Sequence, residues 1–447
     1  MIFEPYLRNW DEAWYAEIIR NMADGSGLLV PFWNGHFYFD KPPLYFWLTL
    51  PIVKVFGPPA GGGEWQTRTV SIMAGLIVVF LVFLIGKKLF NKTVGVLASL
   101  IFLSLGQVAV RFNHGNLDAL LVCFFLLTFY FYLLSKNNSI FTVLAGIFLG
   151  LGFLIKGWFV GLFPLLWIFS YSIFAEQKLP KKLMSILIFA IISSGWWFLT
   201  GIVKFGRPFV DWYLLNPTGG LLAKPFESFS LNYFADLVRD IGFWWILITL
   251  GLMKFRQIVH KEKLILVSFL LPAFIFIFSL NFLSEKLGWY NLPAYPLIAI
   301  IVGLLGSKLF LYSKKIVTVV VCILFVFQIY WITRIENIYP DRSKIGADLG
   351  KYAKEIVPKN EALILDDHDF SAFLYYSSHK VVYVLQKGGG KPGEWWILDY
   401  GDLENFLSDN PRTWIVTSNI DNLKNYVEDI PAKNFYNGYW FVKFEKS

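Results

Sequence analysis

Long apolar runs and short polar connections alternate along most of the chain. Each run holds roughly 17–20 apolar residues, the length that an α-helix needs to cross the hydrocarbon core of a bilayer. The predicted crossings are residues 69–86, 94–110, 117–134, 140–156, 158–175, 183–203, 236–253, 264–282, 292–310 and 316–333. Residues 140–175 also fit a single broken hairpin. The pattern therefore indicates a mainly α, polytopic membrane protein with about ten transmembrane helices.

Two shorter helices are predicted before the first crossing. Apolar positions recur at helical spacing between Asn9 and Ala23, where Asn9 and Glu12 have the spacing of a capping box. Residues 44–55 form a second short apolar segment. Both segments are too short to cross a bilayer, so we expect interfacial helices.

Basic residues lie in alternate connections between the predicted crossings. They are Lys87, Lys88 and Lys92; Lys136; Lys178, Lys181 and Lys182; Lys254, Arg256, Lys261 and Lys263; and Lys308, Lys314 and Lys315. The positive-inside rule makes these connections cytoplasmic. The other connections, including 1–68, 204–235 and 283–291, then face outward, and so does the chain beyond residue 334.

The last part of the chain has a different composition. Mixed polar sequence follows Arg334, with short alternating segments. Strands are predicted at 362–365, 381–385, 396–398 and 414–417, helices at 343–357, 402–408 and 421–429, and a hairpin turn at 436–439. We predict two domains: a transmembrane domain, 1–333, whose residues 1–68 form an outer interfacial catalytic loop, and a small outward-facing soluble α/β domain, 334–447.

The composition supports a membrane protein and argues against nucleic acid as a partner. Of the 447 residues, 56% are hydrophobic and only 16% charged, against about 25% charged in soluble domains. The formal charge of +8 comes from lysines between apolar runs, which suits anionic lipid and not nucleic acid. Cys123 and Cys322 both lie in apolar runs, so no disulfide framework is predicted.

Polar side chains collect at the outward ends of the crossings. They are Asp11, Glu12, Asp40, Lys41, Arg68, Arg111, His114, Asp118, Lys156, Arg207, Lys224, Glu285, Lys286 and Tyr290. Ionisable groups at membrane depth are costly and are candidates for function. A carboxylate can take a proton from an acceptor hydroxyl, and lysine or arginine can neutralise a phosphate leaving group. The set therefore fits a reaction on a substrate with a lipid phosphate.

Four motifs carry a resemblance to a known family. They are Asp11-Glu12-x-x-Tyr15-Ala16-Glu17, the run from Asn34 to Leu44 with Asp40-Lys41-Pro42-Pro43, the Lys156-Gly157 pair, and Lys286-Leu287-x-x-Tyr290-x-Leu292-Pro293. These residues resemble the polyprenyl-phosphate-sugar-dependent GT-C glycosyltransferases, in the bacterial branch with protein mannosyltransferases and lipid A aminoarabinose transferases. The similarity runs through about residues 8–310.

The resemblance implies a role for each motif residue. It implies that Asp11 is the general base, with Glu12, Tyr15 and Asp40 as supporting residues of the site. Lys41 and Lys286 contact the lipid phosphate, and Arg68 and Arg111 are further candidates for this contact. Tyr290 lines the donor site. One displacement at the anomeric carbon then inverts its configuration. Members of this family normally have a crossing before the first outer loop, so we expect the native reading frame to begin upstream of Met1.

Two departures from the family pattern concern charge. Trp14 stands where many members have arginine, shortly after the first carboxylates. Some members bind a divalent metal through an acidic residue before Lys-Pro-Pro and a histidine in the large outer loop. Asp40 fits the first role, but residues 204–235 contain no histidine, and Lys224 can supply the charge instead. A metal is therefore not predicted.

Each candidate also has a purely structural interpretation. In this interpretation the helix dipole favours a carboxylate at Asp11, and Glu12 closes the capping box. Asp40 orients Lys41 through a salt bridge, or Lys41 extends its ammonium to the membrane interface. Lys286 and Tyr290 anchor a loop, and His114 pairs with Asp118 on one helical face.

The functional prediction is an integral membrane glycosyltransferase of the cytoplasmic membrane, with its site on the outer side. Its donor is a polyprenyl-phosphate-linked monosaccharide, and its acceptor is a protein, a lipid or a glycan. The alternatives are a transporter or flippase of lipid-linked sugars, and an oligosaccharide polymerase or ligase. A transporter is expected to show internal repeats with broken helices, and none is evident in the sequence.

Overall fold

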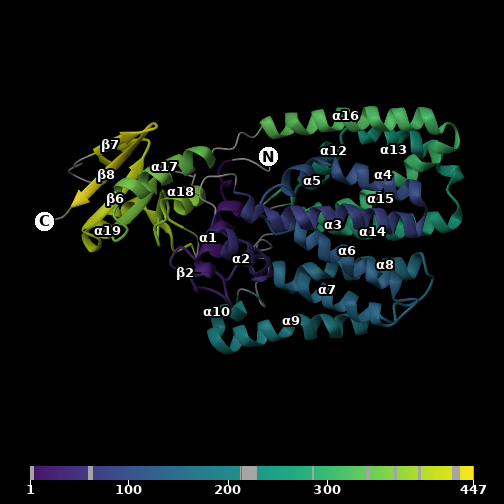
Figure 1. Ribbon diagram of the computed structural model, residues 1–447, viewed down its shortest axis with the longest axis horizontal. Helices are drawn as coiled ribbons and strands as arrows, with labels where there is room; N and C mark the ends of the chain where they lie inside the picture. Colours follow the sequence, from purple (N-terminus) through teal and green to yellow (C-terminus); the bar gives the residue numbers. More distant parts are fainter. Residues whose placement is uncertain are drawn as a thin grey trace. The chain divides into compact units, whose positions relative to one another are not determined.

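The computed structural model describes residues 5–58, 64–211, 213, 229–283, 286–338, 343–366, 370–390, 394–424 and 433–445 (Figure 1). The chain forms two compact units. The first comprises residues 1–38, 49–67 and 341–447, and the second comprises residues 39–48 and 68–340.

Helices build the second unit. They are α3 (Trp65–Leu89, whose first residues belong to the first unit), α4 (Lys92–Leu103), α5 (Gly106–Arg111), α6 (Asp118–Leu134), α7 (Ile140–Lys156), α8 (Leu162–Phe174), α9 (Leu183–Phe205), α10 (Arg207–Val210), α12 (Asn232–Ile241), α13 (Trp244–Leu252), α14 (His260–Leu280), α15 (Tyr295–Ser307) and α16 (Lys314–Ile338). Short 3₁₀ turns follow α7 (Trp158–Gly161) and α13 (Phe255–Gln257) and flank α15 (Leu292–Ala294 and Lys308–Leu311).

Five of the described helical stretches are long and apolar enough to cross a membrane. They are Trp65–Leu89, Leu183–Phe205, His260–Leu280, Leu292–Leu311 and Lys314–Arg334. The shorter apolar helices Lys92–Leu103, Asp118–Leu134, Ile140–Lys156 and Trp158–Phe174 also coincide with predicted crossings. The protein is thus a multi-pass membrane protein, while the count of ten crossings stays a prediction.

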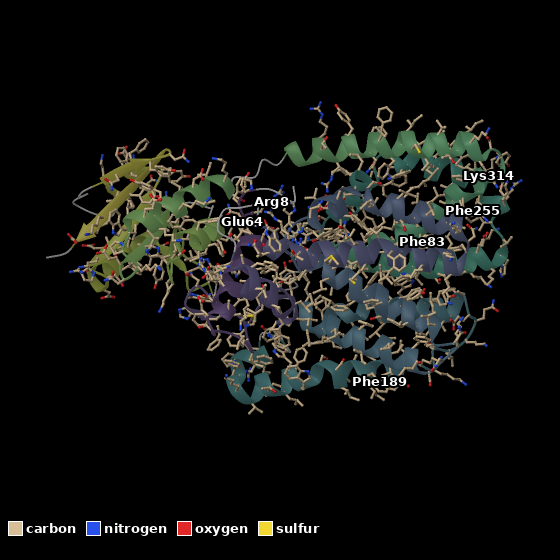
Figure 2. All side chains as sticks on the ribbon, viewed as in Figure 1. Arg8, Glu64, Phe83, Phe189, Phe255 and Lys314 are labelled. Atoms are coloured by element: carbon tan, nitrogen blue, oxygen red, sulfur yellow. The ribbon has the colours of Figure 1, made fainter. Side chains whose placement is uncertain are left out.

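The helices pack through small residues and expose apolar ones. A Cβ added to Gly146 or Gly150 of α7 would overlap α9, and one added to Gly303 of α15 would overlap α4. Close approach through small residues is the usual packing of membrane helices. Figure 2 shows side chains projecting along the length of α9 and α16. Val203 of α9 is 88% exposed, and Val326 of α16 is 67% exposed. Such apolar exposure indicates surfaces that face lipid.

The first unit combines the N-terminal residues with the C-terminal part of the chain. Its N-terminal elements are α1 (Asp11–Ala23), the hairpin of β1 (Phe32–Trp33) and β2 (His36–Phe37), and the larger part of α2 (Leu44–Phe56). The C-terminal elements are α17 (Ser343–Ile356), β3 (Ala362–Asp366), α18 (Phe370–Ser377), β4 (Tyr383–Gln386), β5 (Ile397–Asp399), a 3₁₀ turn (Tyr400–Asp402), α19 (Leu403–Asp409), β6 (Arg412–Thr417), α20 (Ile420–Lys424), β7 (Lys433–Tyr436) and β8 (Tyr439–Glu445).

One six-stranded sheet organises the C-terminal residues, in the order β5-β4-β3-β6-β8-β7. Strands β5, β4, β3 and β6 are parallel, and β8 and β7 are antiparallel to their neighbours. Ile364, Ile415 and Val442 pack in its core. The predicted strands and the hairpin turn are therefore confirmed. Their separation into a domain bounded at residue 334 stays a prediction.

Within the first unit, the N-terminal residues are hydrogen-bonded to the C-terminal part. The Leu7 amide donates to the Tyr376 hydroxyl at 2.9 Å. Asn34 exchanges two hydrogen bonds with the backbone of Val382, at 3.0 and 2.8 Å. Segments more than 340 residues apart thus belong to one unit, which the domain boundaries predicted from composition did not anticipate.

The predicted capping box at the start of α1 is wrong. The N-cap residue is Trp10, whose φ is 62° and whose side chain makes no capping hydrogen bond. The Asn9 side chain accepts a hydrogen bond from the amide of Ala372, the third residue of α18, at 3.0 Å. The Glu12 carboxylate accepts from the Arg8 amide at 2.9 Å. Asn9 therefore caps a helix far away in the sequence, in place of its own.

Candidate active site

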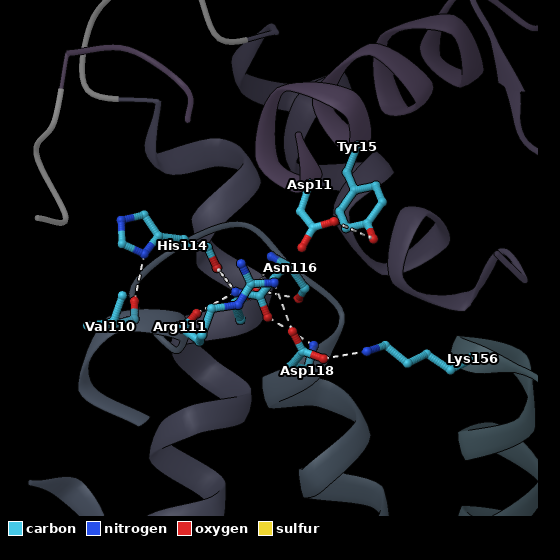
Figure 3. Close-up of polar contacts among 9 residues, drawn as sticks. Asp11, Tyr15, Val110, Arg111, His114, Asn116, Asp118 and Lys156 are labelled. Carbon is cyan, nitrogen blue, oxygen red and sulfur yellow. Dashed lines mark hydrogen bonds and ion pairs between the residues drawn. The ribbon is translucent and has the colours of Figure 1, made fainter. Parts of the chain in front are cut away.

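One buried carboxylate in the second unit holds two cations. Asp118, the first residue of α6, forms an ion pair with Arg111 at the end of α5, with an Nη2–Oδ2 distance of 2.9 Å. It forms another with Lys156 at the end of α7, with an Nζ–Oδ1 distance of 2.5 Å (Figure 3). The Asp118 side chain is 5% exposed, whereas those of Arg111 and Lys156 are 14% and 17% exposed. Both cations therefore reach the surface from an anchored position.

An aromatic ring lies against each of these cations. The Arg111 guanidinium is 4.0 Å from the centre of the Trp289 ring. The Lys156 ammonium is 5.3 Å from the centre of the Tyr290 ring. Contacts of this kind stabilise a cation by roughly 0.5–2 kcal/mol. We refer to Arg111, Asp118, Lys156, Trp289 and Tyr290 as the Asp118 cluster.

The loop before α6 positions the Asp118 carboxylate. The Asn116 side-chain oxygen accepts a hydrogen bond from the Asp118 amide at 2.9 Å. The Asn116 backbone exchanges hydrogen bonds with the Ser71 hydroxyl of α3, at 3.0 and 2.8 Å. The positive end of the α6 dipole also favours a carboxylate at its first turn. The loop is thus fixed to α3, and with it the anchor for the two cations.

His114 does not pair with Asp118 as predicted. Its ring Nδ1 lies 2.6 Å from the Val110 carbonyl oxygen, and both Asp118 oxygens take part in ion pairs. The helix ends at Arg111 and a new one starts at Asp118, so positions 114 and 118 do not share a helical face.

Lys41 is held at its side chain and at its backbone. Its ammonium pairs with the Asp40 carboxylate at 2.5 Å, and the two side chains are 23% and 39% exposed. Its carbonyl accepts a hydrogen bond from the Tyr213 hydroxyl at 2.9 Å. The salt bridge expected between Asp40 and Lys41 is confirmed, and the partial exposure leaves the ammonium accessible to an anion.

Lys286 and Arg68 occupy different environments. The Lys286 ammonium donates to the carbonyls of Leu283 and Asn281, the latter at 3.0 Å. Partial loss of water lowers the pKa of Lys286 below its ordinary value. Arg68 is fully buried in α3. Phosphate contacts by these two residues stay predictions.

In the first unit, α1 carries the predicted base and its neighbours. The Asp11 carboxylate is half-buried and accepts a hydrogen bond from the Tyr15 hydroxyl one turn later, at 3.3 Å (Figure 3). Glu12 is 2% exposed and its carboxylate is bonded to the Arg8 amide. Asp11 is therefore the more accessible of the two carboxylates.

Trp14, which departs from the family pattern, belongs to an aromatic cluster of the first unit. It stacks on Trp33 with ring centres 3.8 Å apart and an angle of 11°. The Trp396 ring meets Trp14 and Trp33 edge-on, at 5.5 and 4.9 Å. The position where many members have arginine serves packing in this chain.

Part of the Asp118 cluster is not predicted from the sequence. Asp118 and Lys156 are predicted to lie at the outward ends of the crossings but receive no role in the site, and Trp289 is not among the predicted site residues. Two signals were available: the Lys156-Gly157 motif, and the position of Trp289 directly before Tyr290.

Lys224 and Glu285 lie outside the described residues. In the described part of the chain, no group of three His, Cys, Asp or Glu side chains has the arrangement of a metal site.

Known proteins resemble this chain in sequence and in fold. Residues 40–198 match the family of dolichyl-phosphate-mannose-protein mannosyltransferases. A protein of unassigned function from Aquifex aeolicus is 27% identical over 301 residues, which cover 65% of this chain and 58% of the relative. The undecaprenyl phosphate-alpha-4-amino-4-deoxy-L-arabinose arabinosyl transferase of Shewanella sediminis is 27% identical over 193 residues, covering 42% of this chain and 33% of the relative. The matched part is thus less than two thirds of each relative's length.

The fold is shared over almost the whole chain. The crystal structure of ArnT from Cupriavidus metallidurans bound to undecaprenyl phosphate matches with a TM-score of 0.77 at 15% identity, covering 99% of this chain and 94% of that chain. At this identity the likeness shows the fold. The matched segment, the relatives and the shared fold confirm the resemblance expected from the motifs, which is a resemblance to the GT-C glycosyltransferases.

Proposed function

We propose that the chain transfers a monosaccharide from a polyprenyl-phosphate donor to a protein, lipid or glycan acceptor on the outer face of the cytoplasmic membrane, with inversion. The observation that carries this proposal is the Asp118 cluster, in which two cations share one carboxylate. The names of the Shewanella relative and of the Cupriavidus structure support an undecaprenyl-phosphate-linked donor.

The charge of the Asp118 cluster fits the leaving group. A polyprenyl-phosphate sugar carries one negative charge on its phosphodiester, and the polyprenyl phosphate gains a second when the glycosidic bond breaks. Arg111 and Lys156 leave one positive charge in excess over Asp118. Donors held in place before the reaction stabilise developing charge without reorganisation, so the cluster favours departure of the phosphate.

Lys41 is proposed as a second phosphate contact. Its ammonium is partly exposed and is oriented by Asp40, and the Tyr213 hydroxyl holds its backbone. A lysine acts on phosphate as a point charge. We assign Lys286, Tyr290 and Arg68 to the donor site on the family resemblance.

Asp11 is proposed as the general base. Its carboxylate is half-buried on α1 and accepts a hydrogen bond from the Tyr15 hydroxyl at 3.3 Å. A partly exposed carboxylate can take a proton from the acceptor hydroxyl as that oxygen attacks the anomeric carbon. A single attack with departure of the phosphate inverts the configuration.

Asp11→Asn tests this assignment. The amide keeps the shape and an oxygen acceptor but loses basicity, so transfer is expected to fall by about 10²–10⁴-fold. Purified protein in detergent is given an undecaprenyl-phosphate aminoarabinose or mannose donor, and donor consumption and product stereochemistry are followed by mass spectrometry and NMR.

Asp24→Asn is the matched control, because Asp24 is exposed at the end of the same helix. It is expected to retain full transfer. An Asp11→Asn protein with wild-type activity removes the catalytic assignment. Movement of the intact donor across proteoliposome membranes, without cleavage of the glycosidic bond, favours a flippase instead.

A further inference from the structure

The C-terminal sheet has a topological switch point. The chain passes from β3 to β4 and on to β5 at one side of the sheet, and then enters β6 at the other side of β3. All four of these strands are parallel. In open parallel sheets, ligands bind in the crevice outside the carboxyl ends of the strands where the order reverses. Here that point lies between the ends of β3 and β6.

A cavity of about 540 Å³ opens at this edge of the sheet. It is lined by Asp366 at the end of β3, Lys387 after β4, Tyr400 after β5, Asn419 after β6, Asn422 of α20 and Tyr439 of β8, among others. Its volume is within the range of about 300–1,000 Å³ that small-molecule sites occupy. The switch point therefore coincides with a space large enough for a ligand.

Asp366 is a positioned carboxylate at the base of this crevice. One of its oxygens accepts a hydrogen bond from the Tyr400 hydroxyl, and the other accepts from the Thr417 hydroxyl at 2.7 Å. These partners come from both sides of β3, so the carboxylate is fixed between neighbouring strands. A carboxylate has about four acceptor positions, and it can therefore accept further bonds from ligand hydroxyls.

The described lining residues carry little net charge. Among the described lining residues, Asp366 and Lys387 carry opposite charges, and Asn419, Asn422 and Gln386 contribute amides. A phosphate is usually bound by an excess of cationic side chains, whereas Lys387 is the one cation among the described lining residues. A ligand with several neutral hydroxyls matches carboxylate, amide and phenol groups better.

We propose that this crevice binds a saccharide. Paired hydroxyls of a sugar would bond to Asp366 and to the asparagine amides of the lining. The proposal stands on the crevice itself and does not require the transfer reaction. If transfer also occurs, the site would hold the glycan part of an acceptor or product.

Direct binding tests the proposal. The full chain in detergent is titrated with methyl glycosides of glucose, galactose, mannose and N-acetylglucosamine and with maltose, and binding is followed by saturation-transfer-difference NMR. We expect saturable binding of at least one of these sugars in the millimolar range or tighter. Asn422→Ala removes an exposed amide of the lining and should weaken that binding about tenfold, as loss of one or two hydrogen bonds does.

Asn434→Ala is the matched control, because Asn434 is an exposed residue of β7 that is not part of the described lining. The affinity of this variant for the sugar should equal that of the wild type. Asp11→Asn should also retain sugar binding, which separates this proposal from the proposed reaction. The inference is overturned if no sugar of the panel binds, if Asn422→Ala and Asn434→Ala bind equally well, or if inorganic phosphate or ADP displaces the sugar and binds more tightly.

Discussion

At the scale of single residues, Asp118 shows how one carboxylate organises a cationic group. Its two oxygens hold Arg111 and Lys156, which are 7 and 38 residues away along the chain. Breaking a buried ion pair by removing one partner is costly, because it leaves the other charge without compensation. The shared Asp118 carboxylate therefore holds Arg111 and Lys156 close together, although their positive charges repel each other. If the cluster binds phosphate as proposed, its cationic donors are already in position.

Lys156→Met provides the test at this scale. The methionine keeps much of the apolar stem but removes the charge, so we expect kcat/KM for the polyprenyl-phosphate donor to fall about 100-fold or more. Initial rates at varied donor concentration measure this effect. Lys308→Met is the control, since Lys308 forms a similarly half-buried ion pair with Glu262 at 2.6 Å. Lys308 follows the C-terminal end of α15, whereas Tyr290 of the Asp118 cluster precedes its N-terminal end. An equal loss in both variants would mean that the effect is structural and not a contact with the donor.

At the scale of elements, Arg20 of α1 connects this helix to α18. Arg20 pairs with Glu17 one turn earlier and donates to the Tyr375 carbonyl at 2.7 Å. Its guanidinium also lies 4.5 Å from the centre of the Tyr375 ring. Burial raises the pKa of Glu17 from 4.5 to about 7, while Arg20 opposes the rise. The attachment of α1 is therefore sensitive to pH.

The sign of this sensitivity follows from the two states. Below pH 4.5, Glu17 is neutral both folded and unfolded, so its burial is not penalised. Between pH 4.5 and about 7, the unfolded state loses the proton first, so the free energy of unfolding falls as pH rises. Full ionisation costs at most about 3 kcal/mol for this shift.

Glu17→Gln should remove this part of the pH dependence. Relative to wild type, the variant becomes more stable between pH 4.5 and 8, and Tm measured by intrinsic fluorescence in detergent reports the change. Glu404→Gln, at an exposed position of α19, should follow the wild-type curve. Parallel curves for wild type and Glu17→Gln would contradict the shifted titration.

At the scale of the whole molecule, the first unit constrains the membrane topology. Residues before the crossings are hydrogen-bonded to residues after them, as with Leu7 and Tyr376. Both segments must lie on the same side of the membrane, so the number of crossings between them is even. The ten predicted crossings satisfy this condition.

Single-cysteine labelling tests the topology. In a background without the two native cysteines, cysteines replacing Asp24 and Glu404 should react with an impermeant maleimide added outside intact cells. Cysteines replacing Lys88 and Lys181 should react only after permeabilisation. All four positions are exposed, so access to them is set by the membrane. Outside labelling at Lys88 would contradict the predicted orientation.

The sequence by itself predicted the helical membrane part, the C-terminal strands and the family that this chain resembles. Apolar runs of membrane-spanning length predict helices because the side chains must be apolar in lipid and the backbone must satisfy its own hydrogen bonds within the segment. The strands predicted after residue 334 were also confirmed, because short apolar runs between turn residues are a local signal of strands. The motifs also predict site roles for Asp11, Lys41 and Tyr290 from their neighbours in the chain, and these roles stay predictions.

Tertiary structure alone decided which partner each polar side chain has. Asn9 has the sequence of an N-cap for α1 but caps α18. Asp118 has the spacing to pair with His114 but holds Arg111 and Lys156. Trp14 stands at an arginine position of the family but stacks on Trp33. Hydrogen bonds and ion pairs act over about 3 Å, so they depend on which distant segments the folded chain brings together, and no local pattern contains that information.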